Sequence, residues 1–344
     1  MKLYSILVRP SLDLLSGFDR ERSHYLALGA LRVCGVSPIR QILSHFTFVK
    51  NERTVFGITF PNPVGAAAGF DKQAKALHGI EAFGFGFAEI GAVTPLPQAG
   101  NPRPRLFRLN EDNAIINRMG FNNEGVNVIA RRLAGYRSLR IPVGANIGKG
   151  KDTPLENAAD DYEKCIITLY PHVDYFTINA SSPNTKDLRQ LQERGRLEKL
   201  LDRAQGSVKS CAAGKNPKPI LLKIAPDLTT QELDDILAVS ASRVQGLIIA
   251  NTTISRTGLR SRYAAEAGGL SGKPVQARAL ELVRYAHTAL PSMPIVGAGG
   301  IFTPDDALRM FDAGASLVQL YSGLIFEGPL LPYRINCVLK QTTT

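Results

Sequence analysis

Residues 173–185, with the sequence VDYFTINASSPNT, join a buried strand to a polar turn and indicate the fold class of the chain. The apolar run 173–178 is typical of a strand that is covered on both faces. Pro183 restricts Ser182 to extended or turn geometry, so the strand must end there. The break leaves amides and hydroxyls at the C-terminal end of a strand, where α/β proteins place their active sites. A single run of this kind is usually an ordinary turn, but similar polar clusters follow the other strands.

Seven further runs resemble this strand, and helical patterns separate most of them. The eight expected strands are residues 64–68, 87–93, 141–147, 175–179, 220–225, 246–251, 295–299 and 317–322. The amphipathic helical patterns cover residues 156–170, 191–211, 230–240, 275–290 and 304–311. This alternation predicts parallel strands joined by right-handed crossovers. The chain from about residue 62 onward therefore fits an α/β fold, a closed (β/α)8 or TIM barrel; an open doubly wound sheet has the same strand count and stays an alternative.

The bulk composition is that of a globular protein with a strongly basic balance. The chain has 344 residues, of which 44% are hydrophobic and 21% are charged, which is enough for one large barrel-type domain. Its formal net charge of +11 favours anionic partners such as phosphates, acidic ligands, anionic lipid or nucleic acid. Basic residues scattered over a solvated surface would give the same balance, so the charge alone selects no partner.

The four cysteines, Cys34, Cys165, Cys211 and Cys337, argue against a metal site. No two of them form a Cys-x-x-Cys pair and no histidine cluster accompanies them, so we expect reduced packing residues in a cytosolic compartment and no bound metal. No apolar stretch approaches the roughly 18 residues of a membrane span. We also expect no secretory signal, because the N-terminus lacks a long apolar core followed by a small-residue cleavage site.

Two segments fall outside the strand–helix repeat. Residues 1–44 mix apolar and cationic positions and predict two short amphipathic helices. Such helices can lie in a membrane interface, but the pattern alone favours a helical hairpin that caps the barrel bottom or packs on another domain. The connection 94–120 is long and rich in Pro, Asn and Arg, and connections of this length usually cover a functional face. We therefore divide the chain into an N-terminal helical segment, 1–44, and a barrel domain, 45–344.

Polar and small residues recur at the ends of the expected strands. Small residues at 66–69 allow a flat ring to approach the backbone, and Lys72 follows them with a cation. The segment 117–122, NRMGFN, offers amides, a turn and an aromatic ring, which suit a planar polar ligand. Asn146 and Asn251 add amides at two further strand ends. Taken alone, Lys72 is equally consistent with a surface lysine, and the asparagines with helix caps. Together, these residues predict one binding site to which several strand ends contribute.

Two further features predict a phosphorylated cofactor. Lys223 lies inside a strand, and a lysine in a barrel strand usually faces the lumen only when it is paired with an anion or an electron-rich ring. The seventh and eighth strands end in 297–300, GAGG, and 321–323, YSG, which predict a phosphate cradle of exposed backbone amides. Flavin mononucleotide (FMN) with a planar polar substrate above its ring fits this combination, although the residues alone do not prove a flavin.

These motifs together resemble those of the dihydroorotate dehydrogenases, specifically the quinone-dependent, membrane-associated class 2 enzymes. The similarity runs over nearly the whole chain and rests on long motifs at residues 67–72, 117–121, 179–184, 223–227, 251–253, 268–272 and 321–323. It implies an FMN-containing (β/α)8 barrel that oxidises (S)-dihydroorotate to orotate in pyrimidine biosynthesis. Class 1 enzymes carry Cys where Ser182 stands, so this serine and the N-terminal helical segment indicate class 2.

The resemblance also implies roles for individual residues. It makes Ser182 the catalytic base, which takes a proton from C5 of dihydroorotate while a hydride leaves C6 for flavin N5. The residues implied to bind substrate are Lys72, Asn117, Arg118, Met119, Gly120, Phe121, Asn179, Asn184, Asn251 and Thr252. Those implied to bind FMN are Ala68, Gly69, Phe70, Asp71, Lys72, Ala92, Asn146, Asn179, Lys223, Ala250, Gly272, Gly300, Tyr321 and Ser322. His24 and Arg108 fall where the family places polar groups near the quinone head.

Class 2 membership changes the expectation for residues 1–44 from a cap to a membrane element. In that class the N-terminal helices sit on the membrane and form a quinone tunnel, so we expect a peripheral protein on the cytoplasmic side of the cell membrane. The expected partners are dihydroorotate, a membrane quinone and the membrane surface, and not nucleic acid. The family often has Thr at the positions of Ala92 and Ala250, which predicts altered flavin affinity rather than lost activity.

Ser182 needs a proton relay to act as a base. A serine hydroxyl is a weak base, and we expect Thr185 or a trapped water to relay its proton.

The rival functions are a flavin barrel that acts on nucleic acid, such as a dihydrouridine synthase, and a non-catalytic barrel that binds phosphate ligands. The first rival uses a catalytic cysteine, and no cysteine lies at an expected strand end.

Overall fold

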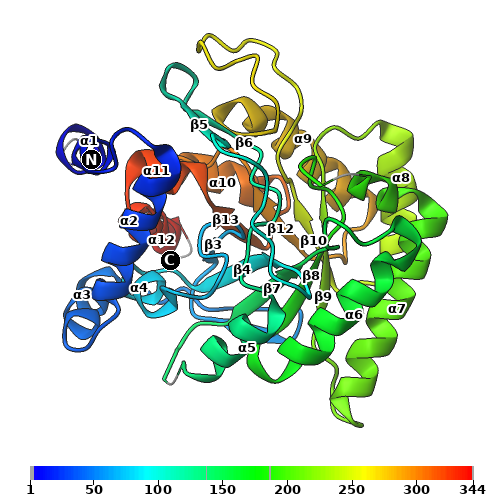
Figure 1. Ribbon diagram of the computed structural model, residues 1–344. Coiled ribbons are helices and arrows are strands. Elements are labelled where there is room, and N and C mark those ends of the chain that lie inside the picture. Colours follow the sequence, from blue (N-terminus) through cyan, green and yellow to red (C-terminus); the bar gives the residue numbers. More distant parts are fainter. Residues whose placement is uncertain (1–3, 137, 186, 343–344) are drawn as a thin grey trace.

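The central feature of the computed structural model is a closed barrel of eight parallel strands (Figure 1). The structure describes residues 4–136, 138–185 and 187–342. In barrel order the strands are β3 (Val64–Ala66), β4 (Phe87–Val93), β7 (Val143–Ile147), β8 (Tyr175–Asn179), β9 (Ile220–Ile224), β10 (Gly246–Ile249), β12 (Ile295–Ala298) and β13 (Leu317–Leu320). All eight expected strands are present and β13 pairs back onto β3. The barrel prediction is therefore confirmed, and the open sheet is excluded.

Helices surround the barrel, and the five predicted ones are among them. The helices that follow the strands are α4 (Leu77–Ala82), α5 (Val126–Ala134), α6 (Ala158–Leu169), α7 (Arg194–Ala212), α8 (Thr230–Ser240), α9 (Gln276–Ala289), α10 (Pro304–Asp312), α11 (Ser322–Glu327) and α12 (Leu331–Thr342). Short 3-10 turns lie at Asn110–Asp112, Leu155–Asn157, Tyr170–His172, Leu188–Gln192 and Lys273–Val275. Helices α8 and α10 begin with capping boxes, built on Thr229 and Thr303. Helices α4, α5, α11 and α12 were not predicted, and α4 and α11 have six residues each, too few to show a helical period.

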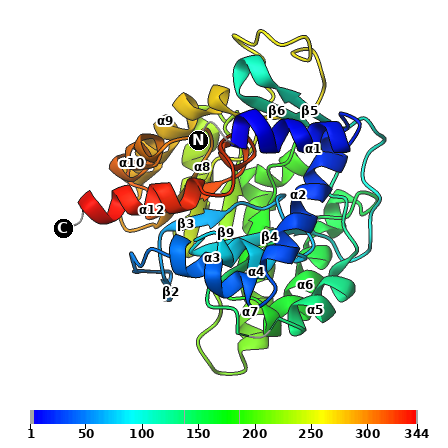
Figure 2. The same cartoon turned by 90° about the vertical axis from the view of Figure 1, so that its left-hand side faces the viewer.

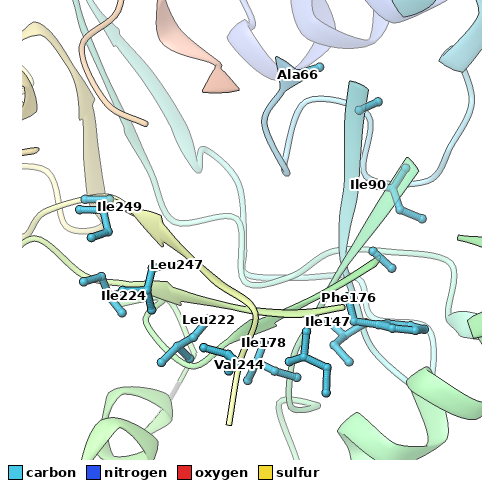
Figure 3. Packing of buried hydrophobic residues seen from close by; sticks show 14 of the residues in the cluster. Ala66, Ile90, Ile147, Phe176, Ile178, Leu222, Ile224, Val244, Leu247 and Ile249 are labelled. Carbon is cyan, nitrogen blue, oxygen red and sulfur yellow. The ribbon is translucent and has the colours of Figure 1, made fainter. Parts of the chain in front are cut away.

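Each barrel strand divides its side chains between two cores, because successive residues face opposite sides of a sheet. The outward-facing side chains, which include Ile90, Phe176 and Ile249, pack in the layer between strands and helices (Figure 3). The inward-facing core of the lumen contains Phe87, Tyr175, Leu221, Ile248, Val296 and Leu317. Two positions further along four of these strands, the inward-facing residues are Glu89, Thr177, Lys223 and Gln319. The lumen thus changes from apolar to polar toward the C-terminal ends of its strands.

A small antiparallel hairpin covers the apolar end of the lumen. It consists of β1 (Arg53–Val55) and β2 (Ile58–Phe60). Phe60 is fully buried and packs edge-on against Phe87, with 5.2 Å between the ring centroids. The barrel bottom is therefore capped by this hairpin and not by the N-terminal helices.

A three-stranded antiparallel sheet extends from the opposite end of the barrel (Figure 1). Its strands are β5 (Leu106–Leu109), β6 (Ala114–Asn117) and β11 (Gly269–Gly272), with β6 in the middle. The long connection 94–120 therefore contains a hairpin that the sequence analysis did not predict. Because β6 ends at Asn117, this sheet carries the segment 117–122 to the C-terminal ends of the barrel strands.

The N-terminal helices pack along one flank of the molecule (Figure 2). They are a π-helical turn (Tyr4–Val8), α1 (Arg9–Leu15), α2 (Arg20–Cys34) and α3 (Ile39–Thr47), and both α2 and α3 contact α4. Helix α3 was not predicted and crosses the expected boundary at residue 44, while residues 1–3 of the segment lie outside the described residues. Within the described residues, no single helix has the length and apolarity to cross a membrane; α2 and α3 meet that test only as a pair, which is bent by 97°.

Candidate active site

A cavity of about 1060 Å³, which includes space open to solvent, lies at the C-terminal ends of the barrel strands. The predicted site residues that line it are Ala68, Gly69, Lys72, Ala92, Asn117, Met119, Gly120, Phe121, Asn146, Asn179, Ser182, Asn184, Lys223, Ala250, Asn251, Thr252, Gly272, Gly300, Tyr321 and Ser322. The barrel thus gathers into one cavity polar and small residues that are dispersed along most of the sequence. We call this space the strand-end cavity.

Ser182 lies in the turn that follows β8 and is 6% exposed. Its hydroxyl oxygen accepts a hydrogen bond from the backbone NH of Asn184 at 3.3 Å, which closes the turn around Pro183. The side-chain amide of Asn184 donates to Oδ1 of Asn117 at 3.2 Å and so ties the turn to the end of β6. The hydroxyl and two amides therefore approach the same part of the cavity from two separate elements.

A row of side-chain amides runs across the strand ends. Asn251 Nδ2 donates to Ser181 Oγ at 2.9 Å and to Asn179 Oδ1 at 3.4 Å. Asn179 Nδ2 donates in turn to Asn146 Oδ1 at 2.9 Å. Because each amide is both a donor and an acceptor, these bonds fix which end of each group is left for a ligand.

Lys72 supplies a cation at one side of the cavity. Its ammonium donates to Oδ1 of Asn122, and Nδ2 of Asn122 donates to the hydroxyl of Tyr25 on α2 at 3.3 Å. Burial and the nearby guanidinium of Arg105 lower the pKa of Lys72 to about 7. An anionic ligand beside the amine would raise that pKa again, so the site favours a carboxylate or another anion.

Lys223 and Gln319 reach the cavity from inside the barrel. Lys223 is 6% exposed, and burial lowers its pKa while the buried carboxylate of Glu89 acts in the opposite direction. The lysine thus faces the lumen near an anion, as its place in a strand predicted. Gln319 donates from Nε2 to Glu89 at 3.0 Å, and its buried Oε1 has no hydrogen-bond partner among the described residues. Such an acceptor at a cavity wall matches a donor on a bound ligand.

Glycines shape the part of the cavity next to β12 and β13. Gly272 and Gly300 have φ angles of +105° and +71°, and a Cβ on Gly300 would come within 2.4 Å of a side-chain atom of Gln276. Ser322 Oγ donates to Ser271 Oγ at 2.8 Å nearby. A narrow, glycine-lined space with hydroxyl groups suits a phosphate group.

Three residues predicted to bind substrate or FMN do not line this cavity. Arg118 points away from it and forms an ion pair with Glu266 at 2.6 Å. Asp71 is buried and accepts backbone hydrogen bonds within the turn after β3, so it shapes the loop. Phe70 faces a second cavity instead. All three adjoin residues that do line the cavity, but consecutive side chains point in different directions, which sequence proximity does not convey.

Two polar residues of the lumen, Glu89 and Gln319, were not predicted from the sequence. Each occupies an inward-facing position in an otherwise apolar strand. The signal that could have found them is the one that identified Lys223, a polar side chain inside a buried run. Ser271 on β11 also lines the cavity and was not singled out, because β11 was not among the predicted strands.

The second cavity measures about 1020 Å³, including space open to solvent, and lies among α1, α2 and α11. Apolar side chains make most of its wall, among them Leu12, Ala27, Ala30, Leu31, Phe83, Phe85, Leu106, Ile115, Leu324 and Ile325. His24 and Arg108, which the resemblance placed near a quinone, also line it. Burial and the nearby Lys72 lower the pKa of His24 to about 4, so its imidazole is neutral at physiological pH. We call this space the flank cavity.

The two cavities adjoin each other at a thin wall. Gly69 and Tyr321 line the strand-end cavity, Phe70 lines the flank cavity, and all three line a small space between them. The rings of Phe70 and Tyr321 meet edge-on with 6.4 Å between centroids. His24 packs edge-on against the other side of Phe70 at 5.5 Å. A group at Gly69 is therefore separated from the flank cavity by one layer of side chains.

Other reactive groups lie away from the strand-end cavity. In the part of the chain that the structure describes, no group of three or more His, Cys, Asp or Glu side chains could hold a metal ion. The four cysteines are free thiols on α2, α6, α7 and α12. The cavity itself offers two lysines, a hydroxyl, several amides and a glycine-lined end. Fold and site together define a (β/α)8-barrel protein whose strand-end cavity suits a planar phosphorylated cofactor and a planar anionic ligand.

Comparison with known proteins narrows this class to one family. The family model described as dihydroorotate dehydrogenase matches residues 51–342. A Chloroflexus aurantiacus protein named dihydroorotate dehydrogenase (quinone) is 50% identical over 344 residues, which cover 97% of this chain and 95% of the relative. The Thermus thermophilus protein of that name is 48% identical over 328 residues, with coverage of 93% and 92%. The crystal structure of an Eimeria tenella DHODH in complex with ferulenol matches with a TM-score of 0.85 and 37% identity, covering 94% of this chain and 92% of that one.

The chain belongs to the dihydroorotate dehydrogenase family, whose members use a flavin. This confirms the resemblance that the sequence motifs indicated. The match includes the N-terminal helices, because the alignment to the Chloroflexus protein covers nearly the entire chain.

Proposed function

We propose that this chain oxidises (S)-dihydroorotate to orotate and passes the electrons through FMN to a membrane quinone, as a step of pyrimidine biosynthesis. The observation that supports the proposal most strongly is the pair of adjoining cavities. The strand-end cavity is polar and suits a small planar acid, whereas the flank cavity is apolar and suits a lipid-soluble acceptor. Electrons need to cross only the layer formed by Phe70 and Tyr321.

The strand-end cavity fits FMN on three counts. Lys223 offers a positive charge for the electron-rich ring, Gln319 offers an unpartnered acceptor for a ring NH, and the glycine-lined end offers room for the phosphate. The residues that would hold the cofactor are Ala68, Gly69, Lys72, Ala92, Asn146, Asn179, Lys223, Ala250, Gly272, Gly300, Tyr321 and Ser322. When bound, the flavin supplies the hydride acceptor. Ala92 and Ala250 present only methyl groups to this space, so altered FMN affinity stays our prediction.

Ser182 acts as the base that accepts the C5 proton of the substrate. The Asn184 backbone NH holds its hydroxyl oxygen, and Asn117 and Asn184 place amides beside it. Lys72 pairs with the substrate carboxylate, and Asn251 and Thr252 line the same cavity. Thr185 is 8% exposed in the same turn and is positioned in sequence to pass the proton of Ser182 onward, directly or through a water.

The flank cavity takes the quinone, with its ring against Phe70 and His24. Neutral His24 offers the quinone a polar ring without placing a second charge near Lys72. Arg108 adds a second polar group and is itself held by two contacts with Asp13, at 2.8 and 3.0 Å. The remaining wall is apolar, which suits a hydrocarbon tail.

The N-terminal helices attach the enzyme to the cytoplasmic side of the cell membrane as a peripheral protein. They carry most of the large hydrophobic side chains that are exposed: Ile6, Leu7, Val8, Leu14, Leu15, Phe18, Tyr25, Leu26, Val33, Val36, Ile39, Ile42 and Phe46. A soluble surface rarely concentrates so much apolar area in one place. Arginines on the same helices favour anionic lipid headgroups.

The decisive experiment follows flavin absorbance through both half-reactions. The purified protein should be yellow, should bleach when dihydroorotate is added anaerobically, and should recover its colour when a soluble quinone analogue is added. A colourless protein that binds only phosphate ligands would favour the non-catalytic barrel. Bleaching that fumarate or NAD reverses, and quinone does not, would contradict the class 2 assignment.

The affinity for orotate should fall as the pH rises above about 7. The pKa of Lys72 is lowered to about 7 in the free protein, so its charge is present below that pH and is lost above it. Pairing with the carboxylate raises this pKa, so affinity should drop up to about tenfold per pH unit until the pKa of the complex is reached. Orotate titrations at several pH values measure this, and Lys72→Met should bind weakly at all of them. A wild-type dissociation constant that does not change with pH would contradict the role of Lys72.

Ala27→Phe should raise the KM for quinone at least about tenfold, because the larger ring fills the flank cavity. The rate of flavin reduction by dihydroorotate should stay at the wild-type value, since Ala27 does not line the strand-end cavity. Steady-state assays with a soluble quinone and single-turnover reduction separate the two effects. A change in flavin reduction with an unchanged quinone KM would place the acceptor elsewhere.

A further inference from the structure

Glu89 is a buried carboxylate beneath the strand-end cavity, and neither the sequence motifs nor the proposed chemistry gives it a role. It lies on β4 and is 2% exposed. Phe87, two residues earlier on the same strand, belongs to the apolar core of the lumen. A carboxylate with so little access to water is stable only when polar groups compensate for its lost hydration. Here the compensating groups come from other strands of the barrel.

Glu89 accepts hydrogen bonds from β7, β8 and β13. Asn146 Nδ2 donates to Oε1 at 2.9 Å, while Thr177 Oγ1 and Gln319 Nε2 each donate to Oε2 at 3.0 Å. The hydroxyl of Tyr175 adds a longer contact of 3.5 Å to Oε2. An ionised carboxylate can only accept, so it determines which end of each neighbouring amide faces it.

The orientation imposed on Gln319 matters for a ligand. Because Nε2 is directed to Glu89, the opposite atom of the amide, Oε1, is left over. That oxygen is buried and has no hydrogen-bond partner in the described part of the chain, and Gln319 lines the strand-end cavity. The cavity wall therefore presents an acceptor at this point, and it would present a donor if the amide were turned over.

The orientation imposed on Asn146 is passed along the amide row. With its Nδ2 bound to Glu89, Asn146 has Oδ1 free to accept from Asn179 Nδ2 at 2.9 Å. Asn179 Oδ1 then accepts from Asn251 Nδ2 at 3.4 Å. Turning over any one amide would set two donors or two acceptors against each other. The row therefore has a single direction that begins at Glu89 and ends at the predicted substrate residue Asn251.

Glu89 also acts on the charge of Lys223. Burial lowers the pKa of this lysine, and the attraction of Glu89 is the effect that raises it. Tyr175 is the other titratable side chain beside Glu89, and burial together with this carboxylate keeps its pKa well above the usual range, so the phenol stays neutral. The pKa of Lys72 depends chiefly on its burial and on the charges of Arg105 and Glu21 instead.

We propose that Glu89 is a positioning residue of the flavin site, which directs the amides of Gln319, Asn146 and Asn179 and sets a negative charge near Lys223. Glu89 does not itself line the cavity, so it acts through these side chains. The inference rests on the proposed function, because it takes FMN as the occupant of the cavity. Its rival is a role in folding alone, in which the buried polar cluster merely packs the lumen.

The first test compares FMN binding by the apoproteins of Glu89→Gln and the wild type. Glutamine keeps the shape of the side chain, removes the charge and replaces one acceptor by a donor. We expect the dissociation constant for FMN, measured by fluorescence quenching, to rise at least about tenfold. Thr177→Val is the matched control, because it removes one donor to the same carboxylate without changing the charge or the amide row. It should alter FMN binding less than about threefold.

The second test uses the midpoint potential of the bound flavin, which a role in folding alone would not move in a pH-dependent way. Without Glu89, only burial acts on Lys223, so its pKa falls further and the amine loses its charge at a lower pH than in the wild type. Because a positive charge favours the electron-rich reduced ring, the potential of Glu89→Gln should drop relative to that of the wild type as the pH rises. This pH-dependent difference should be absent when Lys223→Met is compared with the double variant Glu89→Gln/Lys223→Met.

The outcomes separate this inference from the proposed function. A wild-type apoprotein that takes up no FMN would overturn the proposed function itself. Wild-type FMN binding together with an unchanged dissociation constant and potential in Glu89→Gln would refute the role of Glu89 and leave the function intact. If Glu89→Gln does not fold, Gln319→Met tests the same idea, because methionine lacks the Oε1 acceptor that Glu89 directs toward the strand-end cavity. Unchanged FMN binding in Gln319→Met would then refute the inference.

Discussion

Replacing Ser182 with alanine should slow the reduction of the bound flavin by dihydroorotate at least about 100-fold. The hydroxyl is the proposed proton acceptor, and it is held in a buried turn by the backbone NH of Asn184 at 3.3 Å. Alanine removes the acceptor but leaves Lys72 and Asn251 in place, so orotate binding should change less than about threefold. Anaerobic stopped-flow absorbance measures the reduction rate, and an orotate titration of the oxidised protein measures the binding.

The return half-reaction provides an internal control for Ser182→Ala. Reoxidation by a soluble quinone uses the flank cavity, which Ser182 does not line, so its rate should equal that of the wild type. Ser182→Cys is a second control, because the resemblance places cysteine at this position in class 1 enzymes. The cysteine variant should retain more flavin reduction than the alanine variant. A wild-type reduction rate in Ser182→Ala would eliminate this residue as the base.

Replacing Leu14, Leu15 and Phe46 together with serine should weaken binding to anionic vesicles roughly 1000-fold. These side chains are 68%, 77% and 70% exposed. In a membrane interface each would bury apolar surface worth about 1.5 kcal/mol, and serine contributes almost none of that. Because the three side chains are mostly exposed, thermal stability should change little. Sedimentation with vesicles measures the partitioning directly.

A matched triple variant tests whether the effect belongs to the N-terminal helices. Leu96, Ile167 and Ile254 are 75%, 54% and 55% exposed, and all three lie outside the N-terminal helices. Their replacement with serine should leave vesicle binding unchanged. Activity with a soluble quinone should be the same in both triple variants, whereas activity with a vesicle-embedded quinone should fall only in the first. An equal loss of vesicle binding in both would contradict a membrane face on α1–α3.

The fold class could be predicted from sequence because barrel strands are short apolar runs that alternate with helical patterns. All eight strands were found, and no strand end differs from its predicted position by more than two residues. Most of the candidate site could also be predicted, because a parallel barrel brings every C-terminal strand end to one face. That rule alone predicts that one face of the barrel brings together Ser182, Asn184, Lys223 and Asn251. The two hairpins, β1–β2 and β5–β6, escaped prediction because their strands have only three or four residues and lie outside the strand–helix repeat that identified barrel strands of the same length.

The residues at the strand ends follow from local sequence, because breaks such as Pro183 and the glycine runs set where each strand stops. Which side chains share a space follows from the three-dimensional fold alone. Arg118 forms an ion pair with Glu266, Phe70 lines the flank cavity, and Glu89 accepts hydrogen bonds from three other strands. The physical reason is that these partners are distant in sequence, and their distances follow from strand register and barrel closure, which no local pattern encodes.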